Sequence, residues 1–269
     1  MLYATQGLKP SAFLVDFGRC PESCETGERL ARERESAEEY SKRVSLIMSQ
    51  NLHRGCLRCG TCCRKGGPVL HGEDKEIIRA GYAGYQHLIT IRQGELAFDP
   101  LFNSLRPAAQ EFVKVRGRGK EWCCVFFDAE RTACIIYSHR FLECRLLKCW
   151  DTTGLLGIIG KDTLVRADLI NPDDPVLEVI ALHEKECAVQ EVERLIAALS
   201  LSRNHTTALG QLRELVRKDL AIRQYAIAEL GLREEFELFI FGRPLFNYLE
   251  ARGVPVEFLT SRAWRKTRE

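Results

Sequence analysis

Hydrophobic and polar positions divide the chain into a polar N-terminal part, a cysteine-rich middle and a C-terminal part rich in helix-forming patterns. Residues 28–52 hold many good helix formers and no proline or glycine, which predicts a charged helix with a thin apolar stripe. Residues 172–250 predict three more helices, at about 174–201, 206–229 and 232–250. Pro244 is expected to interrupt or kink the last of them. These helices either form an antiparallel bundle or pack onto the cysteine-rich middle.

The middle of the chain predicts short elements between irregular loops. The stretch GEDKEII, from Gly72 to Ile78, places acids where a helix begins. Between Glu121 and Trp150 the pattern predicts a short strand, a turn near 128–132, and a second short strand that leads into a helical turn. Residues 82–116 have a less definite pattern.

Together these patterns predict a mainly α protein with a small β component. An irregular, metal-nucleated cysteine-cluster domain is expected to pack against a helical C-terminal region. We predict an N-terminal extension with the charged helix at residues 1–52, a cysteine-cluster metal-binding domain at 53–155 and the helical region at 156–269.

The composition of the chain argues against several classes of function. The chain has 269 residues, 45% hydrophobic and 28% charged, and its net charge of +2 gives no basic field for nucleic acid. The start, MLYATQGLKP, lacks the basic and apolar regions of a signal peptide, and no apolar run approaches the roughly 20 residues of a membrane span. We therefore expect a cytoplasmic protein with no membrane partner and no nucleic-acid partner, whose helical C-terminal region binds another protein.

The chain has twelve cysteines, an unusual number for a protein of this composition. In a reducing cytoplasm, clustered thiols are more often metal ligands or redox groups than disulfides. Adjacent cysteines also cannot easily pair with each other, because a disulfide restricts the Cα separation and the Cβ directions. They can instead converge on one metal or cluster.

Eight of the cysteines form two regularly spaced groups. The first group is Cys56, Cys59, Cys62 and Cys63, and the second is Cys124, Cys134, Cys144 and Cys149. A C-x2-C spacing lets two thiolates bind one metal from a tight turn, and Gly55 and Gly60 permit the backbone angles of such a turn. We take these eight cysteines as the candidate metal ligands.

The spacing favours an iron–sulfur centre over zinc without excluding zinc. A C-x2-C-x2-C run is typical of four-iron cluster loops, whereas zinc sites usually combine separated cysteine pairs or cysteine with histidine. His53 and His71 flank the first group and are candidates for such a mixed site, or for surface or supporting roles. Arginine and lysine residues lie in and around both groups, where positive charge favours the thiolate form.

The two groups resemble the YkgJ-type cysteine-cluster family, which is described as zinc- or iron-chelating domains. The resemblance rests on CLRCGTCC, CVFFD, CIIY and HRFLECR and covers about residues 53–150. Phe141 stands where that family usually has proline after the arginine, a departure that removes no ligand. The resemblance implies metal binding by the eight cysteines. Flagellin lysine methylases carry a similar cluster, which implies an iron–sulfur centre and S-adenosylmethionine chemistry.

Other cysteines and one histidine are weaker candidates. Cys20 and Cys24 are either an extra ligand or redox pair or an unrelated surface pair. Cys123 falls outside the pattern, and we expect its side chain to point away from the metal site. His183 and Cys187, in HEKEC, share one helix face and are either metal ligands or core residues.

Three functional hypotheses follow from these observations. The first is a cytoplasmic protein that holds one or two 4Fe-4S clusters, for electron transfer or for support of a modifying enzyme. The second is a zinc-stabilised module that binds a partner, and the third is a cluster-dependent, S-adenosylmethionine methyltransferase-like enzyme. The sequence does not decide whether the chain is an enzyme.

Overall fold

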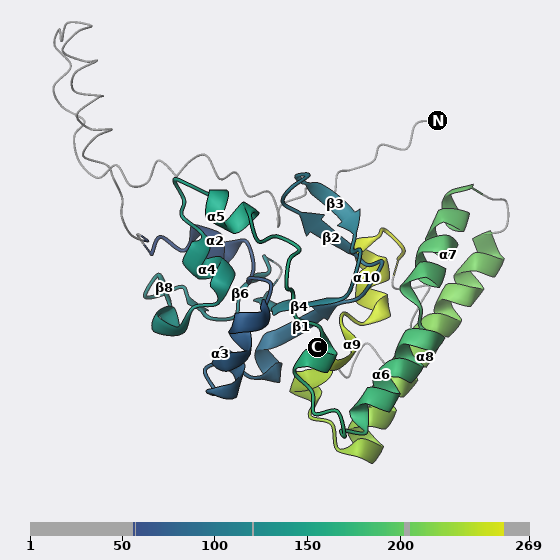
Figure 1. Ribbon diagram of the computed structural model, residues 1–269. Coiled ribbons are helices and arrows are strands. Elements are labelled where there is room, and N and C mark those ends of the chain that lie inside the picture. Colours follow the sequence, from purple (N-terminus) through teal and green to yellow (C-terminus); the bar gives the residue numbers. More distant parts are fainter. Residues whose placement is uncertain (1–55, 57, 120, 202–204, 256–269) are drawn as a thin grey trace, which may run out of the picture.

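The computed structural model describes residues 56, 58–119, 121–201 and 205–255, whose arrangement is shown in Figure 1. The N-terminal extension predicted at residues 1–52, with its charged helix, lies outside the described residues. The helices are α2 (Thr61–Arg64), α3 (Lys75–Arg79), α4 (Leu142–Leu146), α5 (Thr153–Leu156), α6 (Val176–Glu186), α7 (Val189–Leu201), α8 (His205–Leu230), α9 (Glu237–Phe241) and α10 (Leu245–Ala251). The strands are β1 (Leu88–Ile91), β2 (Leu96–Asp99), β3 (Ser104–Pro107), β4 (Phe112–Val115), β5 (Gly117–Arg118), β6 (Cys123–Cys124), β7 (Phe127–Asp128) and β8 (Ala133–Cys134). The described chain is thus mainly α with a small β part, as predicted.

The strands of the described chain form short antiparallel pairs instead of one large sheet. β1 pairs with β4 in a register that sets Leu88 opposite Val115 and Ile91 opposite Phe112. β2 and β3 form a hairpin, and β5–β6 and β7–β8 are two-residue pairs. In Figure 1, β1 and β4 lie between the cysteine-bearing elements and the C-terminal helices.

The short elements predicted from Glu121 to Trp150 are confirmed in outline, with β6, the β7–β8 hairpin and α4 in that order. The first four strands, in contrast, fall in residues 82–116, where the pattern was indefinite. All four residues of β1 are buried, so LITI shows no regular alternation of apolar and polar positions, and a short, mostly apolar segment does not distinguish strand from helix. Tertiary packing therefore defines these strands.

The prediction of a single helix at 174–201 was wrong, because the structure has two helices, α6 and α7, in that range. Cys187 ends α6 with φ −126° and ψ 40°. Its carbonyl oxygen accepts a hydrogen bond from Nη2 of Arg92 at 2.7 Å. This partner lies far away in the sequence, so the local helix pattern carried no sign of the break.

The other two predicted helices are confirmed, including the interruption at Pro244. α8 matches the helix predicted at 206–229, while α9 ends and α10 begins on either side of residues 242–244. Gly242 has φ +70°, and a Cβ atom there would lie 2.9 Å from the carbonyl oxygen of Thr90. This position therefore requires glycine.

One hydrophobic core joins the cysteine-rich part to the helical region. It includes Leu70, Val113, Phe126, Ile180, Ala226 and Phe239. α9 packs on β1, while α6 and α7 both pack on α8. The two predicted arrangements therefore occur together, since the helices pack on one another and also on the cysteine-rich part.

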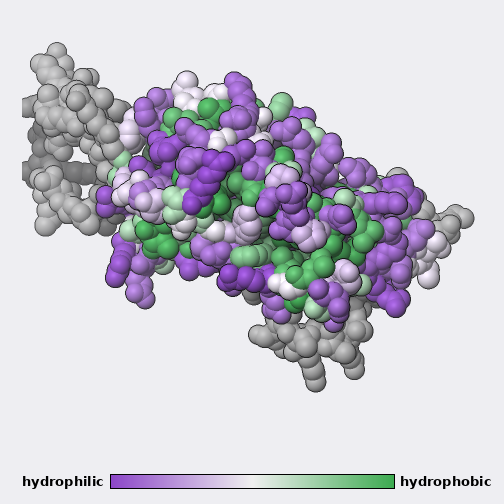
Figure 2. Space-filling view, turned by 60° about the horizontal axis from the view of Figure 1, so that its bottom comes forward, coloured by the Kyte–Doolittle hydropathy of each residue, from purple (hydrophilic) through white to green (hydrophobic). Residues whose placement is uncertain are grey.

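The surface is mostly hydrophilic on the face shown in Figure 2, with hydrophobic residues gathered in patches between the charged ones. None of the described helices combines the length and the apolar character needed to cross a membrane.

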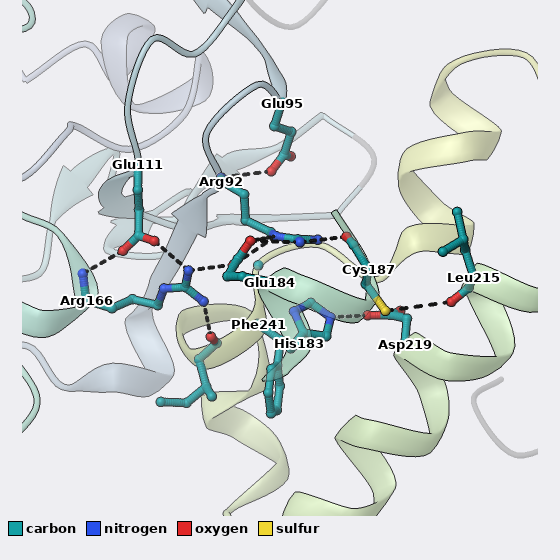
Figure 3. Close-up of polar contacts among 12 residues, drawn as sticks. Arg92, Glu95, Glu111, Arg166, His183, Glu184, Cys187, Leu215, Asp219 and Phe241 are labelled. Atoms are coloured by element: carbon teal, nitrogen blue, oxygen red, sulfur yellow. Dashed lines mark hydrogen bonds and ion pairs between the residues drawn. The ribbon is translucent and has the colours of Figure 1, made fainter. Parts of the chain in front are cut away.

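Two buried arginines connect the cysteine-rich part to α6 through Glu184 (Figure 3). Arg92, which follows β1, donates from Nη2 to Oε2 of Glu184 at 2.8 Å. Arg166 donates from Nη2 to Oε1 of Glu184 at 2.6 Å and from Nη1 to the carbonyl oxygen of Ile240 at 2.5 Å. Both arginines are 2% exposed, and burying their guanidinium groups would be costly without a countercharge. Glu184 supplies this charge to both arginines, and Arg166 also pairs with Glu111.

A second buried contact links α6 to α8. Nε2 of His183 lies 2.7 Å from Oδ1 of Asp219, which also accepts a hydrogen bond from Nε of Arg223 at 2.9 Å. The other oxygen of Asp219 accepts a hydrogen bond from the backbone N–H of Leu245 at 3.0 Å, at the start of α10. Burial lowers the pKa of His183, so the neutral imidazole donates its Nε2–H to the carboxylate. Burial raises the pKa of Asp219, but Arg223 and His183 outweigh this effect and lower it to about 2.

We predict that Glu184→Gln destabilises the fold by about 2 kcal/mol, because buried Arg92 loses its carboxylate partner and buried Arg166 keeps only Glu111. The partial exposure of Glu184 keeps the cost below that of a fully buried pair. Urea unfolding at neutral pH measures the change. Glu178→Gln, at an exposed position on the same helix, is the control and should unfold like the unmodified chain. Equal stability of the two variants would contradict the role given to Glu184.

We also predict that His183 makes the fold less stable as the pH falls below about 6.5, whereas His71, whose pKa Glu143 helps to raise against burial, acts in the opposite direction. The folded pKa of His183 is lowered, so the unfolded chain takes up a proton there at a higher pH than the folded chain does. This uptake lowers the free energy of the unfolded chain relative to the folded one. Asp219 adds a loss at lower pH, between its ordinary value of 3.8 and about 2. Thermal unfolding from pH 7.5 to pH 5 measures the first effect. His183→Asn keeps an amide donor for Asp219 without titrating, so it should flatten the slope, and an unchanged slope would refute the assignment.

Candidate metal centre

The first cysteine group lies partly on a loop and partly in the helix that follows it, since Cys62 and Cys63 belong to α2. Gly60 has φ +74°, and a Cβ atom there would lie 2.4 Å from Cζ of Phe127, so only glycine fits. The amide of Arg58 donates to Sγ of Cys56 at 3.4 Å, and Sγ of Cys59 lies 3.3 Å from Oγ1 of Thr61. The expected role of Gly60 is confirmed, whereas Gly55 and His53 lie outside the described residues.

The second cysteine group comes from three short elements. Cys124 ends β6 opposite Gly117, and Cys134 ends β8 opposite Phe127. Cys144 lies in α4, and Cys149 lies in the turn that follows it. The β5–β6 and β7–β8 pairs give Cys124 and Cys134 defined backbone positions without a large sheet.

Two carboxylates hold α4 against the segment that follows the first cysteine group. Oδ1 of Asp74 accepts a hydrogen bond from the backbone N–H of Leu142 at 2.8 Å, at the start of α4. Oε2 of Glu143 accepts one from the backbone N–H of Val69 at 2.8 Å. Each segment thus supplies an acceptor for a backbone donor of the other. We call this pair of contacts the carboxylate clamp.

His71 supports the clamp and has both ring nitrogens engaged. Nδ1 lies 2.8 Å from the carbonyl oxygen of Lys161, and Nε2 lies 3.4 Å from Oε1 of Glu143. His71 is buried and does not line the cavity that contains the cysteines. Of the roles that the sequence left open for His71, its contacts favour the supporting one.

All eight predicted cysteines line one cavity of about 710 Å³. The two groups therefore meet, although Cys63 and Cys124 are far apart in the sequence. Cys123 is absent from the lining, as expected from its place outside the repeated spacing. Aromatic and branched side chains that follow Cys124 and Cys134 in the sequence, Phe126, Phe127, Ile136 and Tyr137, contribute to the walls.

Phe141, at the position where the resembling family usually has proline, keeps a proline-like backbone. Its φ is −59° and its side chain is 2% exposed, packed beside Phe126 at a ring distance of 6.0 Å. Phenylalanine at this position therefore lacks the rigid ring of proline but adds a side chain that packs in the core. The turn into α4 is retained.

The thiols influence one another strongly. The hydrogen bond from Cys63 lowers the pKa of Cys62 to about 6, and the same contact raises the pKa of Cys63. Burial raises the pKa of Cys124 to about 11 and also raises the pKa values of Cys134 and Cys144, and neighbouring thiols add to each shift. Several thiolates can exist here together only if a cation offsets their mutual repulsion.

Arginine side chains are placed around the thiols by aromatic contacts. The guanidinium carbons of Arg58 and Arg140 lie 4.1 and 3.9 Å from the ring centroid of Tyr137. Nη1 of Arg64 donates to the carbonyl oxygen of Cys59 at 3.2 Å. Positive charge is thus fixed close to the cysteine loops, as their sequence positions suggested.

The donor set fits a thiophilic metal, because thiolates select zinc and iron–sulfur centres. Sγ of Cys62 and Sγ of Cys63 are 4.0 Å apart, close to the roughly 3.8 Å expected for two thiolates on one tetrahedral zinc ion. Within the described residues, however, no three His, Cys, Asp or Glu side chains are arranged to hold a metal ion as they stand. The thiols line the wall of a cavity and do not meet at one point.

The weaker candidates lie elsewhere. His183 and Cys187 are fully buried between α6 and α8, outside the cavity lining, where His183 binds Asp219. Of the two readings of HEKEC, the structure favours the core one, and Glu184 of the same motif pairs with the two arginines. Cys20 and Cys24 lie outside the described residues.

Sequence reasoning missed Asp74 and Glu143 as supporting residues. The helix start predicted at GEDKEII is confirmed by the turn at Gly72–Asp74 and by α3. Asp74, the last residue of that turn, also accepts hydrogen bonds from the backbone of His71 and of Leu142. The other signal in the sequence is the acid directly before the second-last candidate ligand, in Glu143-Cys144.

Comparison with known proteins supports the chelating role of this region. Residues 55–163 match the CxxCxxCC family model, described as "Putative zinc- or iron-chelating domain". This agrees with the resemblance found in the sequence at the level of the cysteine-cluster family. Neither curated proteins nor solved structures gave a match to the chain.

We predict that Asp74→Ala costs about 2 kcal/mol or more, because two backbone donors lose a buried acceptor. Loosening of α4 should also make Cys144 react faster with iodoacetamide, as followed by mass spectrometry of the peptide. Asp173→Ala, at an exposed position, should change neither stability nor labelling. Unchanged labelling of Cys144 in the Asp74→Ala variant would show that the clamp does not position this cysteine.

Proposed function

We propose, from the premise that residues 55–163 of this chain belong to the CxxCxxCC family, that its eight clustered cysteines hold one or two 4Fe-4S clusters. The ligands would be Cys56, Cys59, Cys62, Cys63, Cys124, Cys134, Cys144 and Cys149. When bound, such a cluster supplies a one-electron redox couple. The function is electron transfer, or electron supply to a modifying enzyme.

The observation that carries this proposal is the meeting of all eight thiols around one cavity. A single zinc ion uses four ligands, half of the cysteines that line this cavity. Eight thiols around one cavity suit a group with several metal atoms, each bound by its own cysteine. The spacing of the first group supports the same choice.

The residues around the thiols have separate tasks in this proposal. Phe126, Phe127 and Ile136 exclude water from the centre, which affects its reduction potential. Arg58 and Arg140, held on Tyr137, balance the negative charge of metal-bound thiolates. The carboxylate clamp keeps Cys144 facing the first group.

A cytoplasmic location and a protein partner belong to the same proposal. The ten cysteines in the described part of the chain are all free thiols, which suits a reducing compartment. The helical region exposes Leu182 and Tyr225, at 48% and 52%, and these side chains support the expectation of a protein partner there.

The test is metal analysis of protein purified without oxygen. We expect a brown protein with iron and acid-labile sulfide in similar amounts. Cys124→Ser and Cys134→Ser should lose most of the iron, because each removes a ligand. Cys123→Ser is a matched control beside Cys124, and it should keep the iron because Cys123 does not line the cavity.

Other outcomes would select the alternative functions. A colourless protein with stoichiometric zinc, lost in Cys124→Ser but kept in Cys123→Ser, would replace the cluster by a zinc-stabilised binding module. Tight binding of S-adenosylmethionine by the iron-loaded protein, measured by calorimetry, would favour the methyltransferase-like enzyme over an electron carrier.

A further inference from the structure

The cavity of the metal centre is open to solvent at three of its thiols. Of the eight cysteines that line it, Cys56, Cys62 and Cys149 are exposed, whereas the other five are buried or partly buried. These three positions mark where water, oxygen or another molecule can reach a bound metal.

Large apolar side chains are exposed along the same cavity. Leu101 and Phe102, at the tip of the β2–β3 hairpin, and Trp150, next to Cys149, line the cavity and are 54%, 61% and 49% exposed. Leu105, on β3 of the same hairpin, is 58% exposed. We call these four side chains the apolar rim. Exposed apolar residues gathered at one cavity indicate a surface that another segment or molecule covers.

The sequence that leads into this cavity is itself apolar. Cys56 follows closely after residues 44–52, VSLIMSQNL, none of which is charged. Charged residues are frequent from 28 to 43, in the first part of the same predicted helix. The change in composition predicts that the part of the helix nearest Cys56 packs against an apolar surface and does not lie free in water.

One face of the predicted helix collects the large apolar residues. Tyr40, Val44, Ile47 and Met48 have the spacing i, i+4, i+7 and i+8, so they form one stripe, and Ser49 falls on the opposite side. This stripe and the apolar rim are complementary, because each has apolar area that needs a cover.

The chain length brings the stripe within reach of the rim. Leu52 ends the predicted helix four residues before Cys56, a distance of at most about 14 Å when extended, and Met48 lies roughly one helical turn, or ~5.4 Å, further along. Cys56 lines the same cavity as Leu101 and Phe102. Because so short a connection joins the two apolar surfaces, their contact loses little chain entropy.

We propose that the apolar stripe of residues 40–52 binds the apolar rim and shields the exposed thiols of the metal centre. These residues precede the family match, which begins at residue 55, so the shielding segment is an addition of this chain to the chelating module. The contact goes beyond the metal-binding proposal and does not depend on which metal the thiols hold.

The test is photo-crosslinking in the full-length protein. Benzoylphenylalanine in place of Phe102 should form a crosslink to residues 40–52, identified by mass spectrometry of the peptides. Ile47→Asp should lower the crosslink yield severalfold, because a carboxylate would have to be buried in the contact. Ser49→Asp adds the same charge on the opposite side of the predicted helix and should leave the yield unchanged. Benzoylphenylalanine in place of Tyr225, exposed on α8, should not reach residues 40–52.

Release of the bound metal to EDTA measures the shielding. It should be severalfold faster in Ile47→Asp than in the unmodified protein, and Ser49→Asp should behave like the unmodified protein. If the purified protein holds no metal, the metal-binding proposal fails, and the rate at which iodoacetamide labels Cys62 gives the same comparison.

The proposal is overturned if benzoylphenylalanine at position 102 does not reach residues 40–52, or if Ile47→Asp and Ser49→Asp give equal yields and equal release rates. A mixture of isotope-labelled and unlabelled protein separates the occupants of the rim. Crosslinks within one chain support the proposal, whereas crosslinks between labelled and unlabelled chains would assign the rim to a second copy. In a cell extract, a crosslink to another protein in place of residues 40–52 would assign it to a partner.

Discussion

The carboxylate clamp is the contact on which the geometry of the cysteine site depends. Asp74 accepts a hydrogen bond from Leu142, and Glu143 accepts one from Val69, so two segments about seventy residues apart exchange buried backbone bonds. A buried N–H without an acceptor costs the fold free energy, so each carboxylate favours the approach of the two segments. Cys63 precedes one segment closely and Cys144 adjoins Glu143. The clamp therefore fixes one cysteine group relative to the other.

The helical region supports this arrangement from the opposite side of β4. Val113 and Val115 of that strand enter the shared core, while Phe112 and Lys114 face the cavity. Alternation along one short strand thus separates the part of the fold that provides stability from the part that lines the site. The ion pairs of Arg92 and Arg166 with Glu184 keep the helices on the core.

The sequence predicted individual helices and the set of clustered cysteines better than it predicted which distant residues contact one another. The eight cysteines were recognisable from spacing alone, and Pro244 and Gly60 act as local chemistry requires. The break at Cys187 depends on Arg92, a partner distant in the sequence, so no local pattern could reveal it. β1 was missed for a related reason, because burial on both faces removes the alternation that identifies a strand. Asp74 looked like an ordinary acid of a first helical turn, and only the fold shows its second hydrogen bond.

The electrostatics of the cavity explain why thiols, cations and apolar walls occur together. An apolar wall raises the pKa values of the cysteines, so protons compete with any metal for the sulfur atoms. Cations at fixed positions reduce this competition without occupying the ligand positions themselves, which is what the stacking of Arg58 and Arg140 on Tyr137 achieves.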